Sequence, residues 1–171
     1  LVWKARAAVA AEYTRRGPAT ALTPAFVQLA EASSLEDLLD GLSQGRYHIG
    51  SAAAPLVFQI AEAGDQIARD VIRWAGEELA SLACGVIRQI GVEKEAVEIV
   101  LIGSLYNGGE LLLGPLLSAI QEVAPRACLV RLTAPPVAGA VLLGMEQAAL
   151  DGFALRSQLM ESTGAFLFRR S

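Results

Sequence analysis

The sequence has little of the side-chain chemistry on which most catalytic and metal sites depend, because it contains one histidine and two cysteines. Cys84 and Cys128 lie far apart and match no metal-ligand spacing, so we expect no metal site. Both lie in apolar segments, which favours reduced thiols in the core and fits a cytoplasmic location. His48 is expected to be a loop residue. No serine–histidine–acid or cysteine–histidine set can be assembled, so no catalytic residue is assigned.

Charge is also scarce, at 19% of residues with a net charge of −4. No cluster of Lys and Arg exceeds two residues, which argues against nucleic acid as a partner. No uninterrupted apolar run reaches the roughly 18–20 residues that span a bilayer, so no membrane partner is expected. No signal peptide is recognisable. Two phosphate-binding motifs are missing as well: the Walker A loop and the Gly-x-Gly-x-x-Gly fingerprint.

Apolar residues, by contrast, make up 53% of the 171 positions, enough for one domain with a core. The mean hydropathy of +0.42 is high. One explanation is that another lobe or subunit covers part of the surface. Leu1 already lies within a helical pattern, so we expect the chain to be a piece of a longer protein.

Helical periodicity dominates the first half of the chain. We expect helices over 2–13, 23–32, 35–42, 51–63 and 65–90, begun respectively at Val2 and at the caps Thr23, Ser34, Ser51 and Asp65. The longest helix ends at Gly91 and has an expected ion pair between Asp65 and Arg69. Its predicted apolar stripe consists of Ile67, Val71, Ala75, Leu79, Leu82, Val86 and Ile90. The acidic residues Glu36, Asp37, Asp40, Glu77 and Glu78 are expected to be solvated.

The pattern changes after Gly91. Residues 97–102 are nearly all apolar, which predicts a strand buried on both faces, and 127–132 form a second strand. Helices are expected over 110–123 and 137–150, with a helical turn or two in the tail at 155–160. This order implies a right-handed crossover and a parallel strand pair. Two strands do not make a stable sheet alone, so a preceding segment or a partner is expected to supply others.

Two loops of this region contain candidate ligand-binding features. The loop 103–109 follows the first strand, and ligands bind outside the carboxyl ends of strands in open α/β sheets. Gly103 would let a flat group approach the backbone. The second segment, 133–140, has two prolines before a helix of small residues, which favours close packing or close ligand approach.

These stretches in this order resemble the BadF/BadG/BcrA/BcrD ATPase family, which includes the N-acetylglucosamine kinases. The resemblance covers about 1–149 and is carried by four runs: 16–23, 53–65, 97–116 and 132–140. It implies an α/β fold, namely the helix-rich C-terminal lobe of an actin-like (ribonuclease H-like) ATPase, truncated before its first strands. Residues 1–150 would form this lobe and 151–171 a C-terminal tail.

The resemblance also implies a function, that of a two-lobed kinase that uses ATP and Mg²⁺. The family's adenosine motif matches Gly103, Ser104, Leu105 and Tyr106. Its Asp-Gly-Gly-Gly-Thr phosphate stretch is absent from this chain. The implied partners are a small-molecule sugar such as N-acetylglucosamine and the N-terminal lobe. Independently of the resemblance, the high apolar content and the missing sheet partner lead us to expect a second copy in a homodimer.

Two alternatives stay open. One is an activator ATPase of acyl-CoA dehydratases or reductases, whose iron–sulfur cluster is held by cysteines in glycine-rich loops. The predicted positions of Cys84 in a helix and Cys128 in a strand favour the kinase branch over this one. The other alternative is a non-catalytic dimerisation module, in which the apolar helices bind a twin.

Overall fold

The computed structural model describes the backbone of residues 1–132 and 134–168, and their side chains except those of 153 and 163–168. The chain divides into two compact units, 1–99 with 103–129, and 100–102 with 130–171. Thr133, in the predicted turn, and 169–171, in the predicted tail, lie outside the described residues. Among the described residues, no helix is both long and apolar enough to cross a membrane.

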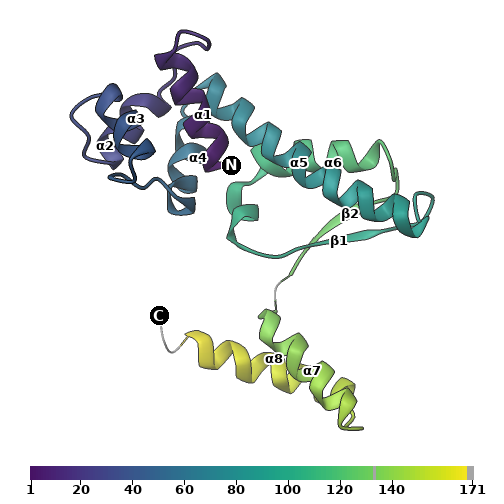
Figure 1. Ribbon diagram of the computed structural model, residues 1–171. Helices are drawn as coiled ribbons and strands as arrows, with labels where there is room; N and C mark the ends of the chain where they lie inside the picture. Colours follow the sequence, from purple (N-terminus) through teal and green to yellow (C-terminus); the bar gives the residue numbers. More distant parts are fainter. Residues whose placement is uncertain (133, 169–171) are drawn as a thin grey trace. The chain divides into compact units, whose positions relative to one another are not determined.

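The first unit is built mainly from helices, coloured purple to green in Figure 1. They are α1 (Val2–Tyr13), α2 (Leu22–Leu29), α3 (Leu35–Ser43), α4 (Ala54–Glu62), α5 (Gln66–Ile90) and α6 (Glu110–Gln121), with the short 3-10 helices η1 (Ser51–Ala53) and η2 (Ser104–Gly108). Their apolar faces meet in one core. Its largest fully buried side chains include Phe26, Leu22, Leu38, Ile72, Val9 and Val57.

Local capping signals were correct at three helix ends. The Ser34 hydroxyl accepts the N–H of Asp37 at 3.1 Å, and the Asp65 carboxylate accepts the N–H of Ala68 at 2.8 Å. Gly91 ends α5 in the left-handed conformation, with φ 72°.

Two other predicted caps were wrong. The Thr23 hydroxyl donates to the Glu12 carboxylate instead of capping α2, which already begins at Leu22. Ser51 begins η1 and makes no side-chain cap. At Thr23 a tertiary contact with Glu12 replaces the predicted cap. At Ser51 the chain forms a 3-10 turn in place of the predicted α-helical start.

The predicted stripe of α5 was wrong in its second half. Leu82, Val86 and Ile90 are 71%, 56% and 64% exposed. The buried face is instead made by Ala68, Val71, Ile72, Ala75, Gly76, Ala80, Cys84 and Ile87. α6 packs along α5, and the backbone of α6 approaches Gly76 closely. Small residues such as Gly76 allow α6 to approach α5 closely, and Leu82, Val86 and Ile90 lie outside this buried face.

The expected Asp65–Arg69 ion pair is also replaced. Asp65 is engaged by the start of α5 and by the segment before α2, where it accepts the N–H of Ala21 at 2.7 Å. Arg69 turns its guanidinium away and donates Nε to the carbonyl of Ala61 at 2.8 Å. Hydrogen bonds to backbone groups, and for Asp65 also to the Thr20 hydroxyl, thus replace the expected ion pair.

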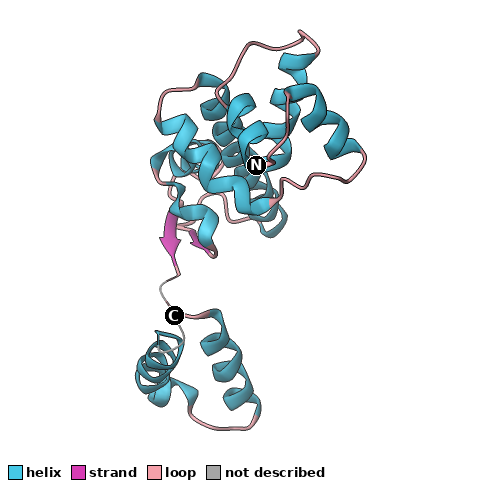
Figure 2. Cartoon of the chain, turned by 90° about the vertical axis from the view of Figure 1, so that its left-hand side faces the viewer, coloured by secondary structure: helices cyan, strands magenta, loops and turns pink. Residues whose placement is uncertain are grey.

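Two short strands, β1 (Glu98–Leu101) and β2 (Cys128–Arg131), form a parallel sheet (Figure 2). The N–H of Cys128 donates to the carbonyl of Val97 at 2.9 Å, and that of Leu132 to Leu101 at 3.1 Å, in the same register. The parallel pairing was predicted correctly. Burial on both faces was not, because Val100 and Ile102 are 50% and 58% exposed.

The two cysteines differ in their surroundings. Cys84 is buried in α5, with its Sγ 3.7 Å from the carbonyl of Ala119. Cys128 is exposed on β2, so its prediction as a core thiol was wrong. Both are free thiols. The sequence marks β2 as apolar, but only the tertiary structure shows which of its residues are left uncovered.

The second unit contains α7 (Pro136–Gln147) and α8 (Gly152–Phe168), which pack against each other (Figures 1 and 2). α8 is longer than the one or two turns expected for the tail. Ala138 is buried, whereas Val137, Val141 and Leu143 are exposed. The molecule is therefore helix-rich α/β with one small parallel sheet, and its relation to the actin-like fold stays a prediction.

Candidate functional site

The first unit contains a pocket of about 1030 Å³. Four segments line it: the start of α1, residues 48–55, one face of α4, and η2. The lining residues are Leu1, Val2, Trp3, Arg6, His48, Ile49, Gly50, Ser51, Ala52, Ala54, Pro55, Phe58, Gln59, Glu62, Ser104, Leu105, Asn107 and Gly108. The volume is in the range of pockets that bind small molecules and cofactors.

Core packing places the helical walls of this pocket. Val2, Ala5 and Val9 form the buried face of α1, which leaves Trp3 and Arg6 on the neighbouring faces. Val57 and Ala61 play the same role in α4, so Phe58 and Glu62 lie beside the buried face. The anchored faces thus hold the pocket-lining side chains on rigid helices.

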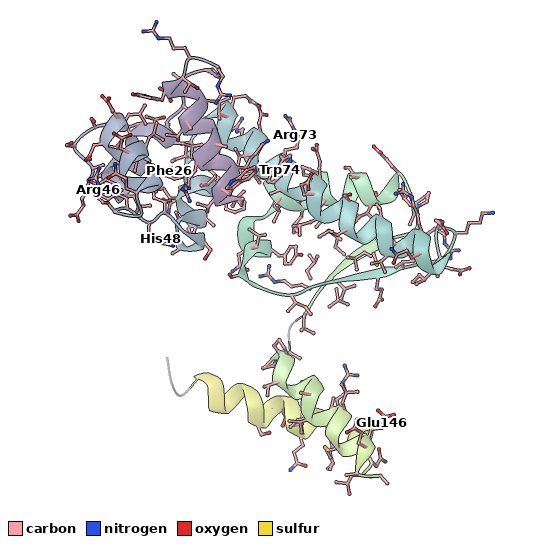
Figure 3. All side chains as sticks on the ribbon, in the orientation of Figure 1. Phe26, Arg46, His48, Arg73, Trp74 and Glu146 are labelled. Atoms are coloured by element: carbon pink, nitrogen blue, oxygen red, sulfur yellow. The ribbon has the colours of Figure 1, made fainter. Side chains whose placement is uncertain are left out.

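The segment before α4 is held by Ile49, which is buried. Its neighbour His48 is exposed and lines the pocket (labelled in Figure 3). His48 therefore lies in a loop, as predicted from the sequence. Its position at the pocket was not anticipated.

Glycines shape the η2 wall. Gly103 and Gly109 flank η2 with φ values of 113° and 61°, which L residues with side chains rarely adopt. Gly108 lies directly against the ring of Phe58, where no side chain would fit. η2 is therefore seated on α4, with its ends turned by two glycines.

Of the four residues predicted to bind adenosine, two line the pocket and two do not. Ser104 and Leu105 line the pocket. Gly103 and Tyr106 are not among its lining residues. Gly103 makes the turn out of β1, and Tyr106 is half-buried and packs against the core. Their assignment to nucleotide binding stays a prediction, in which these two residues would act by shaping η2.

Several lining residues were not singled out from the sequence. Trp3 and Arg6 on α1 and Phe58 and Glu62 on α4 lie far from η2 along the chain, and no binding role was predicted for them. A helix turned toward a ligand and one turned toward solvent have the same periodicity. Only the packing of α1 and α4 onto the core brings these residues to η2.

The pocket has little net charge. Among its described lining residues, Arg6 is the one Lys or Arg side chain and Glu62 is the one Asp or Glu side chain. Ser51, Gln59, Ser104 and Asn107 add uncharged polar groups. Such a lining suits a largely neutral ligand with a flat apolar body and a few polar groups. Within the described residues no group of three or more His, Cys, Asp or Glu side chains could hold a metal ion.

The two carboxyl groups with shifted pKa values lie outside the pocket. The N–H of Ser33, the hydroxyl of Tyr47 and the guanidinium of Arg46 hold the pKa of Asp37 well below its usual range. Asp37 was expected to be merely solvated, which was wrong. It joins the start of α3 to 46–47 and so has a structural role.

For Asp65, burial alone would raise the pKa. Hydrogen bonds from the N–H groups of Ala21 and Ala68 and from the Thr20 hydroxyl outweigh burial and lower its pKa. Asp65 thereby ties the start of α5 to the segment before α2. Both shifted carboxylates therefore stabilise helix junctions and do not belong to the candidate site.

Comparison with known proteins finds similarity to a sugar kinase. No family model matches the chain. The chain is 31% identical over 138 residues to the N-acetyl-D-glucosamine kinase of Dictyostelium discoideum, a match that covers 75% of this chain and 42% of that protein. The chain thus spans less than half the length of the curated relative it matches. This supports the sugar-kinase part of the resemblance stated above, and the narrower BadF/BadG/BcrA/BcrD assignment stays a prediction.

Proposed function

We propose that the chain is the nucleotide-binding lobe of an ATP-dependent kinase that phosphorylates an amino sugar such as N-acetylglucosamine. The observation that carries the proposal is the position of Ser104 and Leu105. They follow the carboxyl end of β1, a typical ligand position in α/β sheets, and they line the pocket of about 1030 Å³. The similarity to a sugar kinase supports the choice of reaction.

The charge of the pocket favours the adenosine end of ATP over its phosphates. Kinases grip the phosphates with several cationic or backbone donors and with Mg²⁺. Among the described residues that line this pocket, Arg6 is the one Lys or Arg side chain, and Glu62 lies in the same lining. The chain contains no Asp-Gly-Gly-Gly-Thr run. We therefore assign the phosphates, Mg²⁺, the catalytic base and the sugar to a partner lobe of the same kinase, in the cytoplasm.

This division of labour has a measurable consequence. Adenosine alone should bind weakly, near a Kd of about 1 mM or −4 kcal/mol. AMP and ADP should bind about equally well, because their phosphates extend beyond the residues that this pocket supplies. A strong gain in affinity with each phosphate would contradict the assignment.

The decisive experiment is an NMR titration of the chain with adenosine. The amides of 103–106 and of the pocket wall at Phe58 and Gln59 should shift. Ser104→Tyr, which places a large ring in the pocket, should abolish the shifts. Ser118→Tyr is the matched control, since Ser118 is exposed on α6 and does not line the pocket. Shifts confined to other parts of the chain would overturn the proposal.

A non-catalytic dimerisation module remains the second candidate, and one observation favours it. Leu82, Val86 and Ile90 form an exposed apolar line along α5. Such a line is typical of a helix that packs against another surface. A chain that dimerises through this line and binds no adenosine would support the module over the kinase lobe.

A further inference from the structure

Trp3 presents a large aromatic side chain at the wall of the pocket. Its side chain is 67% exposed and lines the pocket. Isolated exposed apolar residues are normal on a protein surface. A large aromatic ring at the wall of a pocket that also contains polar groups is instead typical of a ligand-binding surface.

The ring of Trp3 has an aromatic neighbour. Trp74 of α5 lies beside it, with ring centroids 6.4 Å apart and planes inclined at 48°. Trp74 is half-buried and packs against the core, and Lys4 places its Nζ 5.0 Å from the centroid of the Trp74 ring. Figure 3 shows Trp74 on α5 where this helix passes α1. The pair thus restricts the orientation of Trp3 without burying it.

The residues around Trp3 indicate what kind of ligand would stack on its ring. Leu105 and Pro55 add apolar surface, and Ser104 and Asn107 add hydrogen-bonding groups without net charge. A nucleobase has this combination, with an apolar π-face and a polar edge. A base stacked on an aromatic side chain gains affinity whatever its identity, and the larger purine face gains more contact than a pyrimidine.

We propose that Trp3 is the stacking surface for the adenine ring in this pocket and that it makes the pocket favour purines over pyrimidines. This inference rests on the proposed function, because it takes the pocket to bind the adenosine end of ATP. Trp3 binds the base face, and the η2 wall with Ser104 and Leu105 contacts its edge and the ribose.

Tryptophan fluorescence tests the inference directly, because the chain contains two tryptophans. In Trp74→Phe, Trp3 is the single emitter. Adenosine should quench this emission with a saturable curve, uridine should quench it more weakly, and N-acetylglucosamine should leave it unchanged. Quenching by N-acetylglucosamine but not by adenosine would overturn the inference in favour of a sugar pocket.

Substitutions provide the second readout, measured by NMR titration in the otherwise unchanged chain. Trp3→Ala should weaken adenosine binding about 10-fold or more, whereas Trp3→Phe, which keeps a ring, should retain most of it. The melting temperature of either variant should change little, since Trp3 is largely exposed.

The outcomes separate this inference from the proposed function. If adenosine shifts the amides of 104–105 equally in the wild type and in Trp3→Ala, the stacking role is wrong and the nucleotide-binding proposal stands. If adenosine shifts neither these amides nor the Trp3 emission, both are wrong.

Discussion

Gly108 of η2 lies so close to the ring of Phe58 on α4 that a methyl group at position 108 would overlap the ring carbons. This contact joins two walls of the pocket that are distant in the sequence. Since Phe58 is itself held beside the buried face of α4, the position of η2 depends on the absence of a side chain at 108. The geometry of the proposed nucleotide site therefore depends on this pair.

Gly108→Ala should displace η2 and weaken adenosine binding about 10-fold, a loss of about 1.4 kcal/mol, measured by NMR titration. Phe58→Leu in the same chain should restore part of the affinity, because it removes the ring that the new methyl group meets. Gly114→Ala is the control, since a methyl group there makes only ordinary contact with Glu110. Unchanged binding by Gly108→Ala would show that η2 adjusts without cost.

Substitution by alanine should have opposite effects on the free energy of unfolding at two glycines of α5. A Cβ on Gly76 would lie 2.7 Å from the carbonyl oxygen of Leu112 in α6, whereas a Cβ on Gly85 would meet nothing within 4 Å. Gly85→Ala should raise the free energy of unfolding by about 0.5–1 kcal/mol, the helix-propensity gain. Gly76→Ala should lower it, because the two helices must separate. Thermal or urea unfolding measures both, and stabilisation by Gly76→Ala would contradict the close packing.

Asp65 should make stability depend on pH. Its carboxylate accepts hydrogen bonds from the Thr20 hydroxyl and from the N–H groups of Ala21 and Ala68. Its pKa is lowered in the folded chain. The contribution is therefore complete above the unfolded-state pKa of about 3.9 and is lost as pH falls through the lower folded value.

Asp65→Ala should accordingly cost about 0.5–2 kcal/mol at pH 7. The difference from the wild type should narrow as the pH approaches 2 in urea-unfolding experiments. Asp70→Ala serves as the control, because its pair with Arg73 is exposed on the surface and such pairs contribute at most about 1 kcal/mol. A difference independent of pH would contradict the charge-assisted role of Asp65.

The chain by itself should show no kinase turnover. Phosphoryl transfer needs bound Mg²⁺, a phosphate grip and a positioned base, and no such set is recognisable in these residues. Purified chain with ATP, Mg²⁺ and N-acetylglucosamine should release ADP at the rate of a buffer blank. Turnover above the blank that is lost in Ser104→Tyr would contradict this prediction.

Self-association is expected through the exposed apolar line of α5. Leu82, Val86 and Ile90 lie on one side of the helix with no cover in the described part of the chain. Sedimentation should show a dimer at high micromolar concentration, and Val86→Glu should shift it toward monomer. Ser81→Glu, at an exposed position of the same helix, is the control for added charge. A wild-type monomer at that concentration would argue against the interface.

Residues that act on their own backbone neighbourhood could be predicted from the sequence. Ser34 and Asp65 cap the helices that follow them, and Gly91 ends α5, because each signal depends on atoms within a few positions along the chain. The parallel pairing of β1 and β2 was also correct, since a helix between two short strands leaves few other connections. The predicted loop 103–109 is largely the 3-10 helix η2 in the structure, and its role in nucleotide binding stays a prediction.

Only the tertiary structure shows which side chains of each helix or strand are covered and which reach the pocket. Val86 and Cys128 have the apolar character of core residues and are exposed, because the partner elements cover other faces of α5 and β2. Trp3 and Phe58 reach the same pocket as Ser104 from distant helices. Periodicity specifies that a helix has an apolar face, but the direction in which its other faces point depends on contacts between segments far apart in the chain.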